Sequence, residues 1–184
     1  MVSLNRIVMQ RTSRGWLQAL GPDRLSVLEI SGDWGKSFGF QHYESAHFPD
    51  FDPCEAPLTD AEGKLRKFDL IMANQVWEHI DRPYAATRTI YRMLRKGGWF
   101  WLAVPFFIPY HAAPVDCSRW SARGLKNLLI EGGFAAASIK ADQWGNRAAA
   151  LRNMEPGWPE RRPGDDLTND PKFPLVAWAI GQKG

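Results

Sequence analysis

The chain has 184 residues, of which 45% are hydrophobic and 23% charged, a composition typical of one globular domain spanning residues 1–184 rather than of a disordered chain. Its formal net charge is only +3 and its basic residues are scattered, so a concentrated surface for nucleic acid is not expected. No apolar run approaches the roughly 20 residues that span a bilayer, so no membrane partner is expected.

The first predicted elements are a helix, a strand and a glycine turn. Apolar residues recur at helical spacing from 5 to 20, and a Gly-Pro pair ends that pattern. We expect the segment 1–24 to form an N-terminal helix, which through Trp16 is a candidate lid. Residues 25–31 (LSVLEIS) then predict a β-strand that runs into the glycine turn 32–35 (GDWG).

The stretch from 36 to 67 is the least regular part of the chain, because prolines interrupt it repeatedly. One short strand within 42–51 is the only element predicted before its last ten residues. Residues 68–73 (FDLIMA) are short and almost continuously apolar, which predicts a strand buried on both faces.

The second half of the sequence alternates helices and strands. Asp81 and Pro83 are predicted to begin a helix, as N-cap and first-turn residue, that ends at the glycines 97–98. A second helix is predicted to begin at Ser121. Three further strands and one irregular loop are predicted, the strands at 99–107, 134–141 and 174–180 and the loop at 152–172.

Strand and helix alternating with glycine punctuation favour an α/β fold, namely a mainly parallel, Rossmann-like sheet with helices on both faces. Ligands of such sheets lie beyond the carboxyl ends of the strands. The residues that directly follow each strand are therefore the candidate site.

Residues 27–35 (VLEISGDWG) resemble the first motif of the class I S-adenosylmethionine-dependent methyltransferases, in which an acidic residue near the end of strand one precedes a glycine-rich turn. The resemblance implies that Gly32 and Gly35 let the backbone approach the methionine part of the cofactor. It also implies that Glu29 orients the turn or the cofactor's ammonium group. The cofactor-binding residues implied here are Glu29, Ser31, Gly32, Asp33 and Gly35.

A longer match covers 68–105, where FDLIMANQVWEHIDRP and YRMLRKGGWFWLAVP are similar to the family's fourth strand, following helix and fifth strand. It implies that Ala73, Asn74 and Gln75 line the cofactor site. A third block, 111–134, resembles the segment after strand five, whose D-x-x-R-[FYW]-[ST] pattern is common in bacterial members, some of them in glycan-related pathways. The last strand fits the family's reversed strand seven and is therefore expected to be antiparallel.

The chain departs from the family between the first and fourth strands. Only 33 residues separate Gly35 from Asp69, which removes about one strand-helix unit and predicts a reduced first half of the sheet. Asp50 and Asp52 are the candidates for the acid that holds the ribose hydroxyls, and we take Asp52 as the cofactor ligand. A solvated turn is the alternative interpretation of both.

His111 is the predicted catalytic residue, because a neutral histidine after strand five can orient or deprotonate a methyl acceptor. A surface-loop histidine is the alternative, and His79 is interpreted as structural. Asp116 and Arg119 can instead fix their loop, and Asn146 can cap a turn. The predicted substrate contacts are Tyr110, Asp116, Arg119, Trp144, Asn146 and Arg147.

Spacing argues against two other kinds of site. The segment GDWGKS has two residues between its glycines, where a phosphate-binding loop needs four. Cys54 and Cys117 lie far apart, and no His/Cys/Asp cluster has ligand spacing, so no metal is expected. With two cysteines and no secretory segment in the opening residues, we expect a cytoplasmic protein.

The sequence thus predicts transfer of a methyl group from S-adenosylmethionine to an oxygen or nitrogen of a small molecule or glycan unit. A homodimer is left open. The rival interpretation is a catalytically silent fold that binds a partner or another metabolite, because the shortened region could lack the adenosine pocket.

Overall fold

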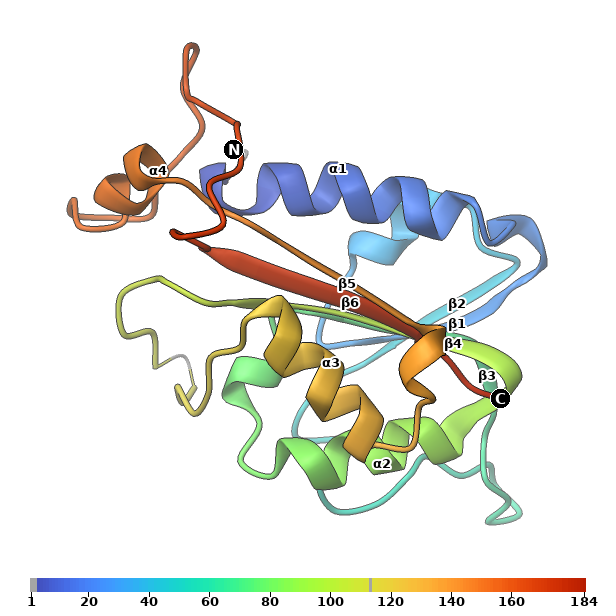
Figure 1. The fold of residues 1–184 in the computed structure, drawn as a ribbon. Coiled ribbons are helices and arrows are strands. Elements are labelled where there is room, and N and C mark those ends of the chain that lie inside the picture. The colour runs from blue at the N-terminus through green and yellow to red at the C-terminus, as the bar shows by residue number, and fades with distance from the viewer. Residues whose placement is uncertain (1–2, 113) are drawn as a thin grey trace.

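The computed structural model describes residues 3–112 and 114–184, which form a six-stranded sheet flanked by helices (Figure 1). The strand order is β2-β1-β3-β4-β6-β5. Neighbouring strands are parallel, except that β6 runs antiparallel to both β4 and β5. The predicted Rossmann-like fold with a reversed last strand is confirmed. The strands are β1 Ser26–Ile30, β2 His42–Ala46, β3 Phe68–Asn74, β4 Leu94–Pro105, β5 Ile139–Trp144 and β6 Val176–Gln182.

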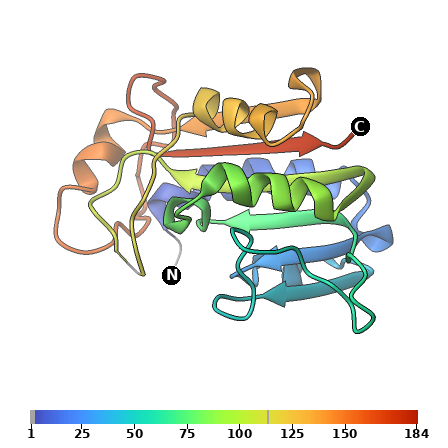
Figure 2. The same cartoon turned by 90° about the horizontal axis from the view of Figure 1, so that it is seen from below.

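Helices cover both faces of the sheet, with α1 on one face and α2 and α3 on the other (Figures 1 and 2). Within the described residues, none of the helices is both long and apolar enough to cross a membrane. The α-helices are α1 Leu4–Gln18, α2 Pro83–Met93, α3 Ala122–Glu131 and α4 Arg147–Arg152, and the 3-10 turns are η1 Pro22–Arg24, η2 Trp34–Phe38, η3 Trp77–His79 and η4 Ala136–Ser138.

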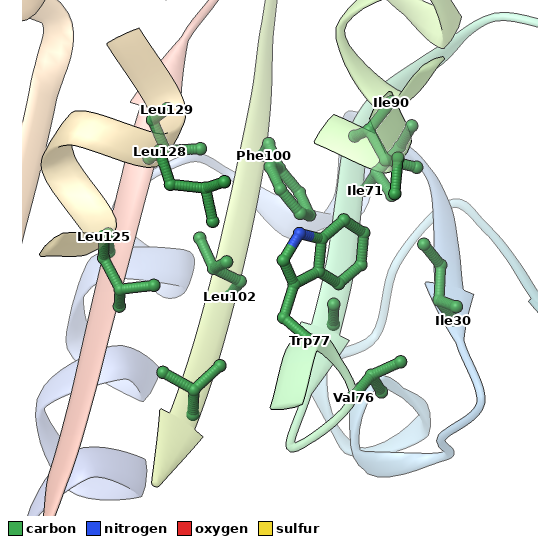
Figure 3. Packing of buried hydrophobic residues seen from close by; sticks show 14 of the residues in the cluster. Ile30, Ile71, Val76, Trp77, Ile90, Phe100, Leu102, Leu125, Leu128 and Leu129 are labelled. Atoms are coloured by element: carbon green, nitrogen blue, oxygen red, sulfur yellow. The ribbon is translucent and has the colours of Figure 1, made fainter. Parts of the chain in front are cut away.

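Each face of the sheet carries its own apolar layer. Trp77 packs beside Phe100 and Leu102 under α2 and α3 (Figure 3). The indole N–H of Trp77 donates to Thr87 Oγ1 at 3.0 Å, so this buried ring retains a partner for its one polar atom. Trp101, which alternates with Phe100 and Leu102 along β4, belongs to the layer under α1. Because both faces are covered, β4 is apolar along most of its length.

The prediction that Asp81 caps α2 is wrong. The N-cap is Arg82, and Asp81 Oδ1 instead accepts a hydrogen bond from the Cys117 thiol. The predicted start of α3 at Ser121 is confirmed, because Ser121 is the N-cap and its side chain accepts a hydrogen bond from the backbone N–H of Gly124. Side-chain capping therefore operates at α3, whereas Asp81 ties the start of α2 to a distant loop.

Two strand boundaries also differ from prediction. β4 begins at Leu94, directly after α2, rather than at 99. β5 begins at Ile139 rather than at 134, because the η4 turn occupies the preceding residues. Ser138 fixes that turn, since its hydroxyl donates to the carbonyls of Ala135 and Gln182.

The helix α1 packs on β5 and β6. The rings of Trp16 and Trp178 have centroids 6.3 Å apart, and the Lys140 ammonium group lies 4.2 Å from the Trp16 centroid. Trp16 thus packs near the amino end of β5, and its role as a lid stays a prediction.

The region between β1 and β3 is short, as predicted. Only the η2 turn lies between β1 and β2. After β2, residues 47–67 return to β3 as irregular chain, apart from one bridge between Thr59 and Leu65. The strand β2 consequently forms one edge of the sheet. Arg66 of the returning segment forms an ion pair with Glu44 on β2 at 2.5 Å.

Candidate functional site

A cavity of about 560 Å³ opens at the carboxyl ends of β1 and β3. This volume falls within the roughly 300–1,000 Å³ that is usual for small-molecule sites. Its lining includes Ser31 and Gln75 at the two strand ends, Asp52 on the returning segment, His79 in η3 and Val115 in the loop before α3. The cavity therefore lies where ligands of parallel α/β sheets bind.

Two residues of this lining have unusual backbone conformations. Ser31 has φ 52° and Gln75 has φ 60°, and they directly follow the neighbouring strands β1 and β3. A left-handed conformation costs a non-glycine residue on the order of 1 kcal/mol or more, and such residues concentrate at functional sites. Their shared position at the mouth of one cavity supports a ligand-binding role for this edge.

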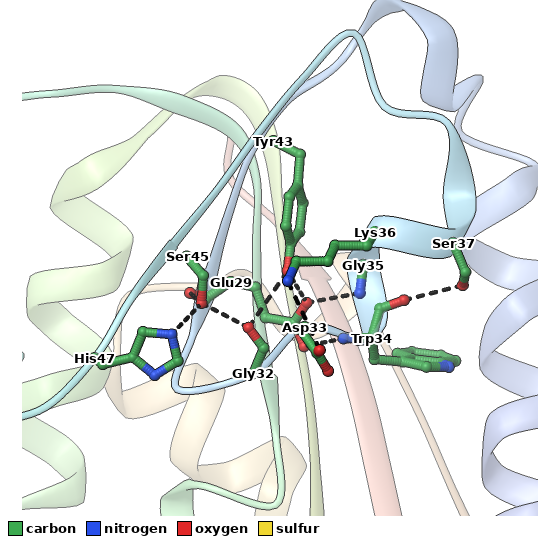
Figure 4. Close-up of polar contacts among 10 residues, drawn as sticks. All are labelled: Glu29, Gly32, Asp33, Trp34, Gly35, Lys36, Ser37, Tyr43, Ser45 and His47. Carbon is green, nitrogen blue, oxygen red and sulfur yellow. Dashed lines mark hydrogen bonds and ion pairs between the residues drawn. The ribbon is translucent and has the colours of Figure 1, made fainter.

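Glu29 organises the glycine turn (Figure 4). Its fully buried carboxylate accepts hydrogen bonds from the backbone N–H groups of Trp34 at 3.2 Å and Gly35 at 2.7 Å, and from the Tyr43 hydroxyl at 2.7 Å. Burial and the contact with Glu29 raise the pKa of Tyr43. The sequence suggested that Glu29 orients either the turn or the ammonium group of the cofactor. The structure contains the contacts between Glu29 and the turn.

The two glycines of the turn make room for protein groups. A Cβ atom on Gly32 would lie 2.4 Å from Glu29 Oε1, and one on Gly35 would lie 2.4 Å from the Tyr43 ring. Asp33 is exposed and forms an ion pair with Lys36 at 3.8 Å. A side chain at either glycine would therefore disturb Glu29 and its hydrogen-bond partners.

The indole of Trp34 points away from the cavity. Its ring packs against Trp101 at a centroid distance of 5.0 Å and against Phe38 at 4.9 Å, in the apolar layer under α1. The glycine turn is therefore not blocked by its own tryptophan.

Of the two candidate ribose ligands, the structure brings Asp52 to the cavity. Asp52 lines it, with Oδ1 accepting the backbone N–H of Cys54 at 2.8 Å, whereas Asp50 is exposed outside the lining. His47 directly follows β2, and its Nε2 lies 3.0 Å from the Ser45 hydroxyl. The sequence-based reasoning did not consider His47.

The end of β3 contributes polar groups that lack partners. Asn74 Oδ1 and Gln75 Nε2 are buried and form no hydrogen bond within the described chain. Ala73, the third predicted contact, is completely buried inside the sheet. Leaving a buried polar group unpaired costs about 1–3 kcal/mol, so these atoms indicate a site for a ligand or an ordered water.

Glu78 is the strongest candidate that the sequence-based reasoning missed. It lies in η3, is 1% exposed, and neither carboxylate oxygen has a hydrogen-bond partner. Burial raises the pKa of Glu78 to about 8, although Arg6 and Arg119 act in the opposite direction. The Glu-His pair in the longest family-like block was the available sequence signal.

His111 lies close to the other aromatic side chains of this edge. Its ring centroid is 5.0 Å from that of His79 and 6.1 Å from that of Trp158. Burial lowers the pKa of His111, and the neighbouring His79 adds to the effect, which favours the neutral imidazole. The predicted pairing of Asp116 with Arg119 is present, and Asp116 also accepts the backbone N–H of His111 at 2.7 Å.

The remaining predicted substrate residues divide into buried and exposed ones. Trp144 is 1% exposed, and its N–H donates to the Leu167 carbonyl. Asn146 caps α4 by accepting from Ala149 N, and its amide donates to two loop carbonyls. Burial and these hydrogen bonds give both residues a structural role, and their contact with a substrate stays a prediction. Tyr110 and Arg147 are exposed.

The sheet order with its single reversed strand, and a cavity at the ends of the neighbouring strands β1 and β3, define the Rossmann-like class to which methyltransferases belong. The family profile described as "Methyltransferase domain" matches residues 6–168. This match covers most of the sequence, so the chain belongs to that methyltransferase family. S-adenosylmethionine is the cofactor that this family assignment supports.

Solved structures agree in fold. A possible histamine N-methyltransferase from Thermotoga maritima is 15% identical with a TM-score of 0.58, covering 98% of each chain. An S-adenosylmethionine-dependent methyltransferase from Mesorhizobium loti is 15% identical with a TM-score of 0.55, covering 92% of this chain and 96% of its own. Phosphoethanolamine N-methyltransferase 2 from Haemonchus contortus, in complex with S-adenosyl-L-methionine, is 13% identical with a TM-score of 0.57. The match covers 94% of this chain and 52% of that protein's chain. Among curated proteins, none matches the chain.

Proposed function

We propose that this chain transfers a methyl group from S-adenosylmethionine to an oxygen or nitrogen atom of a small molecule or glycan unit. The cavity beside Ser31 and Gln75 carries this proposal, because it combines a suitable volume with strained backbone and unpaired polar atoms at the ends of β1 and β3. The names of the similar structures, two of which describe N-methyltransferases, favour a small acceptor.

The residues around the cavity are compatible with the cofactor. When bound there, S-adenosylmethionine supplies an electrophilic methyl group. The Asp52 carboxylate would accept hydrogen bonds from the ribose hydroxyls. Asn74 and Gln75 would give their unpaired atoms to polar groups of the cofactor. The turn 32–35, with Asp33 at its surface, would hold the methionine end through backbone groups that Glu29 keeps in place.

The acceptor would enter from the side of His111. Its neutral imidazole, beside His79 and Trp158, would orient the acceptor group, and exposed Tyr110 would contact the remainder of that molecule. Asp116 and Arg119 would position the loop, because their pair fixes the backbone of His111. Holding donor and acceptor together in a water-poor site is the main contribution a protein makes to such a transfer.

Calorimetric titration with S-adenosylhomocysteine, the demethylated cofactor, tests the proposal. We expect binding in the wild-type chain and its loss in Gly32→Val, because even a Cβ at this position meets Glu29 Oε1. Circular dichroism of the variant separates lost binding from lost folding. An absence of both heat and thermal shift at millimolar ligand in the wild type would favour the silent binding fold instead.

A further inference from the structure

Unpartnered buried polar atoms concentrate at one place in the molecule. Among the described residues, seven buried side-chain polar atoms have no hydrogen-bond partner, and five of them belong to Arg6, Asn74, Gln75 and Glu78. Asn74 and Gln75 mark the end of β3, Glu78 lies in the next turn, and Arg6 approaches from α1. Native structures leave few such atoms, so this concentration calls for a functional explanation.

Glu78 contributes two of the five atoms and is surrounded by charged groups from several elements. Arg6 of α1, together with Arg119 and Asp116 of the loop before α3, lies close enough to influence its ionisation. On its own turn, His79 Nε2 lies 3.9 Å from Glu78 Oε1. The carboxyl group is thus held among charges without a hydrogen bond to any of them.

Glu78 also lies next to residues that line the cavity, although it is not part of the lining itself. Gln75, Val76 and His79, its neighbours along the chain, line that cavity, and the backbone carbonyl of Glu78 accepts the N–H groups of Cys117 and Ser118. The segment 114–120 therefore covers Glu78 from outside through contacts that local loop movement can open. Such movement would expose the carboxyl group to a molecule bound in the cavity.

We propose that Glu78 is the proton acceptor of the transfer and that the methyl acceptor is a group carrying a removable proton, either a hydroxyl or an amine. This inference rests on the proposed function. It excludes acceptors without such a proton, such as thioethers and tertiary amines. Arg6 is assigned as a positioning residue that balances the charge of the Glu78 carboxylate.

The proton transfer is balanced within these groups. The O–H or N–H bond of the acceptor breaks, its electron pair stays on the oxygen or nitrogen that receives the methyl group, and the proton bonds to a Glu78 oxygen. The carboxylate becomes a neutral carboxylic acid. Burial raises the pKa of Glu78 to about 8, which makes its carboxylate a stronger base than an ordinary glutamate. His79, 3.9 Å away, can then carry the proton toward solvent.

The first test follows the ¹³C signal of the Glu78 carboxyl in protein loaded with S-adenosylhomocysteine. The probes are ethylamine, ethylene glycol and tetramethylammonium, of which the last carries charge but no removable proton. We expect ethylamine or ethylene glycol to move the signal and tetramethylammonium to leave it unchanged. A response to ethylamine identifies nitrogen as the methyl acceptor, and a response to ethylene glycol identifies oxygen. No response to any probe, or an equal response to tetramethylammonium, would overturn the proposal in favour of a carboxyl group hydrated by internal water only.

The second test compares Glu78→Gln with Glu131→Gln, a change at an exposed glutamate on α3. We expect both variants to bind S-adenosylhomocysteine as the wild type does. Methyl transfer to the responding probe should fall about 100-fold in Glu78→Gln alone, the usual scale of general-base catalysis. The wild-type pH profile should have a limb near pH 8 that Glu78→Gln lacks. Full activity of Glu78→Gln, or no transfer in the wild type, contradicts the assignment, whereas failed cofactor binding contradicts the proposed function itself.

Discussion

Tyr43 on the edge strand β2 and Glu29 on the neighbouring strand β1 are joined by a 2.7 Å hydrogen bond from the phenol hydroxyl to Glu29 Oε2. The same carboxylate oxygen accepts the N–H of Gly35 at 2.7 Å. One buried side chain on β1 therefore holds both the glycine turn and the neighbouring strand β2. Substitutions around it should affect stability and cofactor binding together.

Replacing Tyr43 with Phe removes a hydrogen bond to a buried carboxylate while preserving the ring. We expect the free energy of unfolding to fall by about 1.5–3 kcal/mol, the range for hydrogen bonds to charged groups. Urea denaturation provides the measurement. Tyr84→Phe, at a residue 42% exposed, is the control and should change stability by less than about 0.5 kcal/mol. Equal effects of the two changes would show that Glu29 does not depend on Tyr43.

Gly32→Ala and Gly15→Ala should have opposite effects. The added Cβ at position 32 would displace the Glu29 carboxylate from its hydrogen bonds, so stability should fall by about 1–3 kcal/mol and affinity for S-adenosylhomocysteine should fall as well. Gly15 is an exposed helix residue with no atom near the new Cβ, so alanine there should stabilise the chain by up to about 1 kcal/mol. Unfolding curves and calorimetry on both variants decide the matter, and a stabilised Gly32→Ala would refute the crowding argument.

The stability of the wild type should depend on pH through Glu78. Its pKa is raised by burial from 4.5 in the ordinary case to about 8, so the folded state binds the extra proton. The resulting stabilisation is complete below pH 4.5 and is lost as the pH rises toward 8, by up to about 1.4 kcal/mol per pH unit.

Glu78→Gln removes this titration, so its stability relative to the wild type should increase steadily between pH 5 and 8. Urea unfolding at several pH values measures the difference. Glu131→Gln should instead follow the wild-type slope. Parallel curves for Glu78→Gln and the wild type would mean that Glu78 ionises as an exposed glutamate does.

Asp52→Asn should weaken binding of S-adenosylhomocysteine by about tenfold, corresponding to about 1.4 kcal/mol for a charge-assisted hydrogen bond. Asp50→Asn removes a carboxylate two residues away that lies outside the cavity lining, and it should leave the affinity unchanged. Calorimetry with both variants measures the contrast. If Asp50→Asn proves the more harmful change, the ribose ligand has been assigned to the wrong aspartate.

Much of the fold could be predicted from sequence, because apolar strands such as 68–73 and glycine stops carry local signals. The predicted ends of helices and strands were wrong where a tertiary contact sets the boundary. Asp81 has the composition of a helix cap, yet its carboxylate bonds the thiol of Cys117, which lies 36 positions further along the chain. No local pattern contains such a partner.

The candidate site was less accessible to sequence reasoning. The resemblance pointed to the ends of β1 and β3, where Ser31, Asp52 and Gln75 line one cavity. It did not indicate the importance of Glu78, because burial and missing partners are properties of three-dimensional packing. Trp144 shows the converse, since its position after a predicted strand suggested an exposed surface whereas the fold buries it.

The strand β2 has further significance as one of the two edge strands of the sheet. An open margin presents unpaired N–H and C=O groups to which a foreign strand can add. Here the Glu44–Arg66 ion pair lies alongside it, and prolines interrupt the chain that follows, both of which oppose such addition. Both features therefore disfavour self-association in which β2 of one molecule continues the sheet into the next.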